Sequence, residues 1–205
     1  MPYGSVLAAH TARADLKKNP VEGFSAGLRD DSDPFVWEVM IMGPPDTPYE
    51  GGFFEAEMKF PKDYPNHPPT LTFTSAMWHP NVYPDGKVCI SILHEPGEDS
   101  YGYESSAERW LPIHTVESSA PPLHARARSP RCAASCTPRM SAHGLAAGAS
   151  ASFDSLVAVL VSVISMISSP NDESPANIEA AKEYRDDNKA YHQRVRKIVR
   201  RSQDG

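Results

Sequence analysis

The chain has 205 residues, of which 40% are hydrophobic and 22% charged, and this composition predicts one globular domain with a sizeable core. The formal net charge of −6 argues against nucleic-acid binding, although the segment from Arg194 to Arg201 is locally basic. Three cysteines are too few for a disulfide framework, and the N-terminus lacks the basic start and apolar core of a signal peptide, so we expect a reducing compartment.

The first half of the chain predicts one helix followed by strands. Residues 5–18 carry apolar and basic side chains in a loose helical pattern that ends at a proline. Apolar and polar residues then alternate through residues 35–41 and 54–60, which is the pattern of strands buried on one face. Residues 70–74 and 21–28 supply shorter strands. The short, turn-rich connections favour a four-stranded antiparallel meander.

The C-terminal part of the chain changes to helical spacing. Apolar residues recur there every three or four positions, which predicts helices with one buried face. They are Ile178, Ala181, Tyr184, Tyr191, Val195, Ile198 and Val199. The longest apolar run, residues 156–167, falls short of the ~20 residues needed to span a bilayer, so we expect no membrane-spanning segment. Sheet and helices are segregated along the chain, which predicts the α+β class.

Residues 119–158 differ from the rest of the chain. They are dominated by alanine, serine, proline and arginine and show no sustained period, so we predict a disordered insertion within the single domain formed by residues 1–205. Two of the three cysteines lie in this stretch, and together with two histidines they provide zinc-ligand side chains: Cys132, Cys136, His124 and His143. Their spacing matches no compact zinc site, so we expect no metal.

Residues 79–89 form the most informative run, HPNVYPDGKVC. Its two prolines and its Asp-Gly pair predict a rigid polar turn that ends just before Cys89. A cysteine held at the end of a rigid turn is well placed to act as a nucleophile. The alternation of apolar and polar residues through 88–92 supports a second interpretation, in which Cys89 is a buried strand residue.

This run resembles the active-site signature of ubiquitin-conjugating enzymes. Further matches follow in the order that this family has, and they are residues 43–52 (GPPDTPYEGG), 60–65 (FPKDYP), Pro68-Pro69, Trp110, Pro112 and residues 169–172 (SPND). The resemblance covers nearly everything outside the predicted insertion. It implies the fold of that family, with an N-terminal helix, a four-stranded antiparallel meander and C-terminal helices.

The resemblance implies that Cys89 takes ubiquitin from the activating enzyme as a thioester and passes it to a lysine. A thiolate attacks carbonyl carbon well and its thioester is readily attacked by an amine, so cysteine suits such a carrier. The family assigns Asn81 both a structural and a catalytic role, the second as hydrogen-bond donor to the oxyanion. A turn asparagine that satisfies nearby backbone is the alternative. We expect His79 to be a scaffold residue.

Two further polar residues are candidates near the nucleophile. His94 lies five residues after Cys89, and Ser174 corresponds to a gate residue where other family members carry aspartate. The incoming lysine has a reference pKa near ~10.4, so its neutral form has to be favoured or its proton accepted as the bond forms. A histidine at a strand end and a solvated turn serine are the alternative interpretations.

Residues 95–104 (EPGEDSYGYE) are acidic. A solvated connector is the ordinary interpretation of such a run. Here it resembles the acidic-loop subgroup of the family, whose members build lysine-48-linked chains and include those serving endoplasmic-reticulum-associated degradation by the proteasome. The resemblance therefore implies a cytoplasmic protein, with the nucleus and the cytosolic face of the endoplasmic reticulum as further locations.

The resemblance also implies the partners: ubiquitin, the activating enzyme and a RING-type ligase. The residues expected to contact the ligase are Asn66, Leu111, Pro112 and Ile113, and those expected to face the donor ubiquitin are Val161 and Ser165. Asn66 departs from the family, because many relatives place an apolar anchor there. No cofactor is expected to be bound, since ATP is used upstream by the activating enzyme and the chain carries no glycine-rich phosphate loop.

In the family, one helix would begin near Thr115 and resume at Val159, so the predicted insertion interrupts it. The helix could restart at Asp154 or Ser155 as a new cap, and closing a long loop costs only about 0.6 kcal/mol more per doubling of its length. We expect a folded protein with lowered activity. A translated intron or a gene-model error fits the abrupt change in composition, as does an inactive splice product.

Two rival functions are a non-catalytic binding domain of the same fold and a carrier of another ubiquitin-like modifier.

Overall fold

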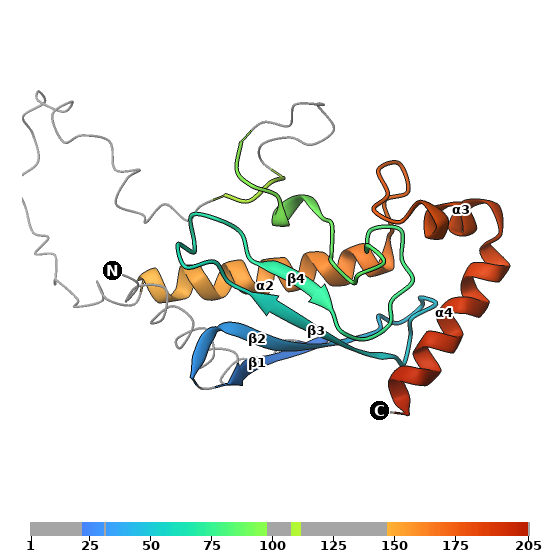
Figure 1. Ribbon diagram of the computed structural model, residues 1–205, viewed down its shortest axis with the longest axis horizontal. Coiled ribbons are helices and arrows are strands. Elements are labelled where there is room, and N and C mark those ends of the chain that lie inside the picture. Colours follow the sequence, from blue (N-terminus) through green and yellow to red (C-terminus); the bar gives the residue numbers. More distant parts are fainter. Residues whose placement is uncertain (1–21, 31, 98–107, 112–146, 205) are drawn as a thin grey trace, which may run out of the picture.

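The computed structural model describes residues 22–30, 32–97, 108–111 and 147–204, with the backbone alone for residues 147–155; Figure 1 shows how the elements are arranged. The elements in chain order are β1 (Phe24–Asp30), β2 (Asp33–Met42), β3 (Phe53–Lys59), β4 (Thr70–Phe73), the short 3-10 helix η1 (Ser91–Leu93), α2 (Ala147–Ser168), α3 (Ile178–Asp186) and α4 (Asn188–Gln203). The helix predicted over residues 5–18 and the predicted helix start near Thr115 lie outside the described residues.

The four strands form one antiparallel sheet in the order β1-β2-β3-β4, which confirms the predicted meander. The register pairs Val39 with Ala56 and Ala56 with Phe73, so inward residues of neighbouring strands lie side by side on one face. The predicted alternation is confirmed by burial of every second residue in β2 and β3, namely Trp37, Val39, Ile41, Phe54, Ala56 and Met58.

Helix α2 covers the buried face of this sheet, which it crosses in Figure 1. Leu160, Val163 and Ile167 are completely or almost completely buried and belong to the same apolar cluster as the inward residues of the sheet. Their spacing of three and four residues keeps them on one side of the helix. The exposed residues on the other side are Ala158, Val161, Ser165 and Ser168, so the serines that interrupt the apolar run are compatible with a helix that packs along one stripe.

The structure corrects the prediction that residues 119–158 are disordered throughout. Helix α2 begins at Ala147, earlier than the restart predicted at Asp154 or Ser155, and Leu156 is 2% exposed within the core. Alanine has the highest helix propensity, so the alanine-rich composition of this part is compatible with helix. The prediction failed because it rested on the low-complexity composition, although an apolar stripe that packs into the core starts at Leu156. Residues 119–146 lie outside the described residues.

The C-terminal helices α3 and α4 confirm the predicted helical spacing and lie at one end of the sheet in Figure 1. Each begins after a side chain that accepts a hydrogen bond from its first turn, Asn177 for α3 and Asp187 for α4. The last turn of α4 is fixed by Gln203, whose Nε2 donates to the carbonyl of Gly51 at 2.8 Å. Among the helices described, none is both long enough and apolar enough to cross a membrane.

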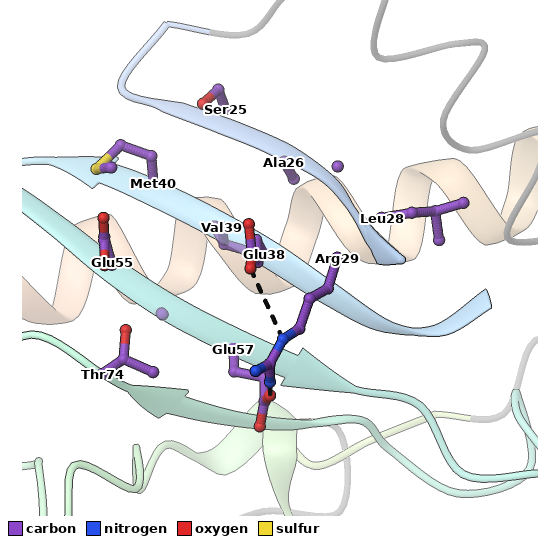
Figure 2. Close-up of a pocket in the computed structure, with 12 residues that line it drawn as sticks. Ser25, Ala26, Leu28, Arg29, Glu38, Val39, Met40, Glu55, Glu57 and Thr74 are labelled. Carbon is purple, nitrogen blue, oxygen red and sulfur yellow. Dashed lines mark hydrogen bonds and ion pairs between the residues drawn. The ribbon is translucent and has the colours of Figure 1, made fainter. Parts of the chain in front are cut away.

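The outer face of the sheet carries charged side chains together with the exposed apolar residues Met42 and Phe53. A pocket of about 610 Å³ on this face is lined by residues of β1, β2 and β3 and by Thr74, and Figure 2 shows how their side chains lie. Arg29 of β1 extends across it to the carboxylate of Glu57, and its Nε lies 3.8 Å from the carboxylate of Glu38. The ion pairs link three strands, although exposed pairs of this kind contribute only about 0–1 kcal/mol each.

The turn before Cys89 is packed against β4 at Gly86. The amide of Phe73 donates to the Gly86 carbonyl at 2.9 Å, and Gly86 has a φ of 89°, a conformation that side chains with a Cβ rarely adopt. A Cβ at this position would lie 2.2 Å from the carbonyl oxygen of Phe73. Only glycine therefore allows this turn to approach the sheet so closely.

We predict that Gly86→Ala lowers the free energy of unfolding by about 3 kcal/mol, because it combines an unfavourable φ with a backbone clash. Chemical denaturation measures this loss. Gly27→Ala is the matched control, since Gly27 lies in β1 with no atom within 4 Å of an added Cβ, and its effect should stay within about 1 kcal/mol. Equal effects of the two substitutions would contradict this account of the turn.

Candidate active site

Cys89 follows a turn that the main chain closes on itself. The Cys89 amide donates to the carbonyl of Asn81 at 3.0 Å, and Val82 and Val88 form an antiparallel bridge. The Val88 amide also donates to Leu71 of β4 at 2.9 Å. Cys89 itself is half-buried and lies outside every strand, so the alternative interpretation as a buried strand residue is wrong. Its thiol is held at the end of a rigid turn, as predicted.

Asn81 is anchored through its side chain and both main-chain groups. Its Oδ1 accepts a hydrogen bond from the Asn171 amide at 2.8 Å, and its Nδ2 donates to the Asn171 carbonyl at 2.7 Å. Its own amide donates to Nδ1 of His79 at 2.9 Å, and its carbonyl accepts from Cys89. Asn81 is only 4% exposed. It therefore satisfies the backbone of a segment 90 residues away rather than that of its own turn.

His79 is a buried scaffold residue, which agrees with the interpretation of the sequence. Because Nδ1 accepts from the Asn81 amide, the ring proton lies on Nε2, which donates to the carbonyl of Met166 in α2 at 3.1 Å. Burial lowers the pKa of His79 from 6.5 to about 4, against the opposing effect of the Met166 carbonyl. The neutral ring ties the turn to α2.

Trp78, immediately before this run, is held by the C-terminal helices. Its carbonyl accepts from the Tyr49 hydroxyl at 2.5 Å, and that hydroxyl lies 2.6 Å from the hydroxyl of Tyr191 in α4. Burial raises the pKa of both tyrosines, so both stay protonated at neutral pH. The indole nitrogen of Trp78 donates to Glu183 at 2.9 Å, and the guanidinium of Arg194 lies 4.1 Å from the centre of its ring.

Two side chains approach the sulfur of Cys89. Nε2 of His94 lies 3.6 Å from Sγ, so the structure brings together two residues that were both predicted for the site. Tyr83 is the second: the charge of the Cys89 thiolate and a hydrogen bond with it raise the pKa of Tyr83, which is 41% exposed. The sequence analysis did not single out Tyr83, although its place in the turn before Cys89 was a usable signal.

Ser174 lies on the segment after α2 that binds the anchored turn. Ser174 is exposed three residues after Asn171, whose main chain binds Asn81. Asn171 also shapes its own segment, since its Oδ1 accepts from the Glu173 amide at 3.1 Å. On α2, Val161 is 48% exposed and Ser165 is exposed one turn later, so both lie on the side of the helix that faces away from the sheet.

Trp110 connects two segments that the sequence analysis assigned to ligase contact. Its indole nitrogen donates to the carbonyl of Pro65 at 2.8 Å, next to the exposed Asn66. Leu111, which directly follows Trp110, is 62% exposed. The structure therefore brings Asn66 and Leu111 onto one region of the surface. Pro112 and Ile113 lie outside the described residues.

Among the residues that the structure describes, no group of three or more His, Cys, Asp or Glu side chains is arranged so that it could hold a metal ion. The four candidate zinc ligands of the predicted insertion lie outside those residues, and so do most of the acidic positions in residues 95–104. The site that the structure does describe consists of a half-buried thiol, an adjacent imidazole and an amide-rich, firmly anchored turn. These groups suit covalent carriage of an acyl group.

A sequence model of ubiquitin-conjugating enzymes matches residues 8–129 and 150–199. The chain belongs to the ubiquitin-conjugating enzyme family. It is 52% identical over 190 residues to ubiquitin-conjugating enzyme E2 14 of Arabidopsis thaliana, with 93% of this chain and 90% of that protein covered. It is 42% identical over 187 residues to the human ubiquitin-conjugating enzyme E2 G2, with 91% of this chain and 89% of that protein covered.

The solved structure of human ubiquitin-conjugating enzyme E2 G1 matches this enzyme with a TM-score of 0.53 and 44% sequence identity, covering 83% of this chain and 98% of that one. These matches confirm the fold class and the enzyme class, a transferase that forms a thioester. The family model leaves residues 130–149 unmatched. This gap is consistent with an insertion, and it is narrower than the predicted range of residues 119–158.

We predict that His79 makes this enzyme less stable as pH falls from about 6.5 to about 4. The folded pKa lies below the unfolded value, so the stabilising contribution is present above pH 6.5 and is lost as His79 has to be protonated. The loss amounts to about 3 kcal/mol over this range. Unfolding free energies of the wild type and of His79→Gln should converge toward low pH; curves that stay parallel would show that His79 is not held neutral.

Proposed function

We propose that Cys89 accepts ubiquitin from the activating enzyme as a thioester and transfers it to lysines of substrates or of ubiquitin. The observation that carries this proposal is the half-buried thiol of Cys89 at the end of an anchored turn, 3.6 Å from the imidazole of His94. Family membership supports the choice of ubiquitin as the acyl group.

The transfer proceeds in two steps. The first exchanges one thioester for another, and the second converts the thioester into an amide. The Cys89 thiolate attacks the thioester on the activating enzyme, whose cysteine leaves as a thiolate and thereby moves the C-terminal carbonyl of ubiquitin onto Sγ. A neutral lysine amine then attacks this carbonyl. The tetrahedral oxyanion collapses, the C–S bond breaks, an amide forms, and the amine loses a proton.

Asn81 is suited to stabilise that oxyanion in addition to its structural role. Its Nδ2 carries two hydrogens, and the bond to the carbonyl of Asn171 uses one of them. The second is the donor that we assign to the oxyanion. Removing such a preorganised donor typically costs about 3 kcal/mol in the transition state. The bonds to Asn171 fix the orientation of the amide, so little reorganisation is needed during the reaction.

We assign His94 and Ser174 supporting roles in the second step. His94 reaches the sulfur and is positioned to accept or relay the proton that the lysine releases. Ser174 lies on the segment bound to Asn81, from which it can contact the incoming lysine. The role of His94 follows from its contact with the sulfur, and that of Ser174 from its place on the segment bound to Asn81.

The proposed partners are a RING-type ligase at Asn66, Leu111, Pro112 and Ile113, and donor ubiquitin at Val161 and Ser165. The exposure of Asn66, Leu111, Val161 and Ser165 supports this assignment.

The acidic-loop likeness of residues 95–104 supports lysine-48-linked chains and proteasomal degradation as the outcome. The enzyme would act in the cytoplasm, the nucleus or at the cytosolic face of the endoplasmic reticulum. It would need no bound cofactor, because the activating enzyme consumes the ATP.

We predict that the enzyme forms a dithiothreitol-labile ubiquitin adduct with activating enzyme and ATP, and that Cys89→Ser abolishes it. Serine can form only an ester, which resists the thiol. Cys132→Ser with Cys136→Ser is the matched control and should retain the adduct. A labile adduct on Cys89→Ser would refute Cys89 as the carrier. An absent adduct on the wild type would favour the non-catalytic rival, and an adduct with a different ubiquitin-like modifier alone would favour the second rival.

We predict that the acidic segment steers a basic acceptor toward the thioester. Replacing Glu98, Asp99 and Glu104 by their amides should slow ubiquitin-chain formation more than it slows thioester loading. Single-turnover assays measure loading and discharge separately. Each is measured at low and high salt, because screening by salt weakens electrostatic steering. Equal slowing of loading and discharge would rule out steering.

A further inference from the structure

His67 joins the loop that carries Asn66, a residue of the proposed ligase-contact region, to the segment that follows His94. Its Nδ1 lies 2.6 Å from the carboxylate of Glu95, and its Nε2 lies 3.2 Å from the carboxylate of Asp63. Asp63 and His67 belong to the loop between β3 and β4, whereas Glu95 directly follows His94. The imidazole therefore bridges the β3–β4 loop and the segment next to the nucleophile.

The bridge requires a particular protonation state. The Glu95 contact is a hydrogen bond and the Asp63 contact is an ion pair; since a carboxylate only accepts hydrogen bonds, both ring nitrogens of His67 have to carry a hydrogen if both contacts are to be attractive. A neutral imidazole has one N–H, and its other nitrogen would present a lone pair to a carboxylate. Only the imidazolium can hold Asp63 and Glu95 together. Deprotonation replaces one of the two attractions by a repulsion.

The electrostatic surroundings of His67 favour this imidazolium. The hydrogen bond to Glu95 and the charges of Asp63 and Glu95 raise the pKa of His67 above 6.5. Within the described part of the chain, the basic side chain of Arg109 contacts this bridge, where its Nη1 donates to the main-chain carbonyl of Glu95 at 3.4 Å. The imidazolium form is present at low pH and is lost as pH rises through the raised pKa.

The position of Glu95 bears directly on His94. The preceding His94 carbonyl accepts from the Trp110 amide at 3.1 Å, and the His94 amide donates to Ser91 at 2.9 Å, so the main chain of His94 is fixed from two sides. On the other side of Glu95, Pro96 restricts its backbone to extended conformations. Holding the Glu95 side chain therefore limits the remaining freedom of the backbone that carries the His94 ring.

We propose that His67 is a positioning residue for transfer at Cys89: as an imidazolium it ties Glu95 to the β3–β4 loop and so holds the His94 imidazole at the sulfur. The inference rests on the proposed function of Cys89 and His94. It adds a pH dependence to that function, because the tie weakens as His67 loses its proton. An exposed tie of this kind has a modest effect, and we expect a two- to fourfold change in the discharge rate.

The bridge itself can be tested without the activating enzyme. Histidine resonances followed by NMR through a pH titration should give His67 a pKa above 6.5, and Glu95→Gln should return it toward 6.5. The alkylation rate of Cys89 by iodoacetamide should respond to Glu95→Gln and to His67→Gln by the same factor. A His67 that titrates identically with and without the Glu95 carboxylate would overturn the proposal.

The catalytic consequence is measured as single-turnover discharge of the ubiquitin thioester to free lysine between pH 6 and pH 9. His67→Gln and Glu95→Gln should each slow discharge two- to fourfold at pH 6.5, and the double variant should be no slower than either single one. His67→Lys keeps a positive charge at every pH, so its rate relative to the wild type should rise about two- to fourfold as pH passes the pKa of His67. His192→Gln, on α4, is the matched control and should change nothing.

Failure of this proposal differs visibly from failure of the proposed function. If the wild type forms no ubiquitin thioester, the function is wrong, while the titration and alkylation results still decide the bridge. If the thioester forms but His67→Lys follows the wild-type pH profile, or the two single substitutions add in the double variant, His67 does not position His94.

Discussion

The active site depends on the pair of hydrogen bonds between the Asn81 side chain and the main chain of Asn171. These bonds join the turn that carries the nucleophile to the segment that follows α2. The Asn81 side chain is buried whereas Asn171 is exposed, so the cost of about 1–3 kcal/mol for a buried polar group that loses its partner applies to the Asn81 amide. The two hydrogen bonds therefore anchor the turn, and the position of Cys89 follows from this anchoring.

A second set of contacts ties the same turn to α2 and to the C-terminal helices. Neutral His79 links it to α2, and Trp78 is held by Tyr49, Glu183 and Arg194. The core of the domain, the C-terminal helices and the turn thus form one continuous framework. A preorganised framework of this kind is what an electrostatic catalyst requires, since its donors need not reorient as charge develops.

The fold was largely predictable because its elements depend on local periodicity. Strands β2 and β3 are buried on one face, and α4 packs through residues spaced three and four apart, so pattern alone indicates them. The beginning of α2 was mispredicted, since a low-complexity composition does not indicate whether a later apolar stripe will pack. Leu156 belongs to the core because the sheet lies opposite it, and that is a property of the assembled domain.

The sequence by itself determined the candidate nucleophile, the turn that presents it and the family, because these depend on residue types at short, fixed spacing. Only the tertiary structure decided what Asn81 binds, that His94 reaches the sulfur and that His67 bridges two carboxylates. Asn81 and Asn171 are separated by 90 residues, and the two carboxylates at His67 belong to different segments. Contacts between distant segments are set by the packing of the whole core, which local pattern does not encode.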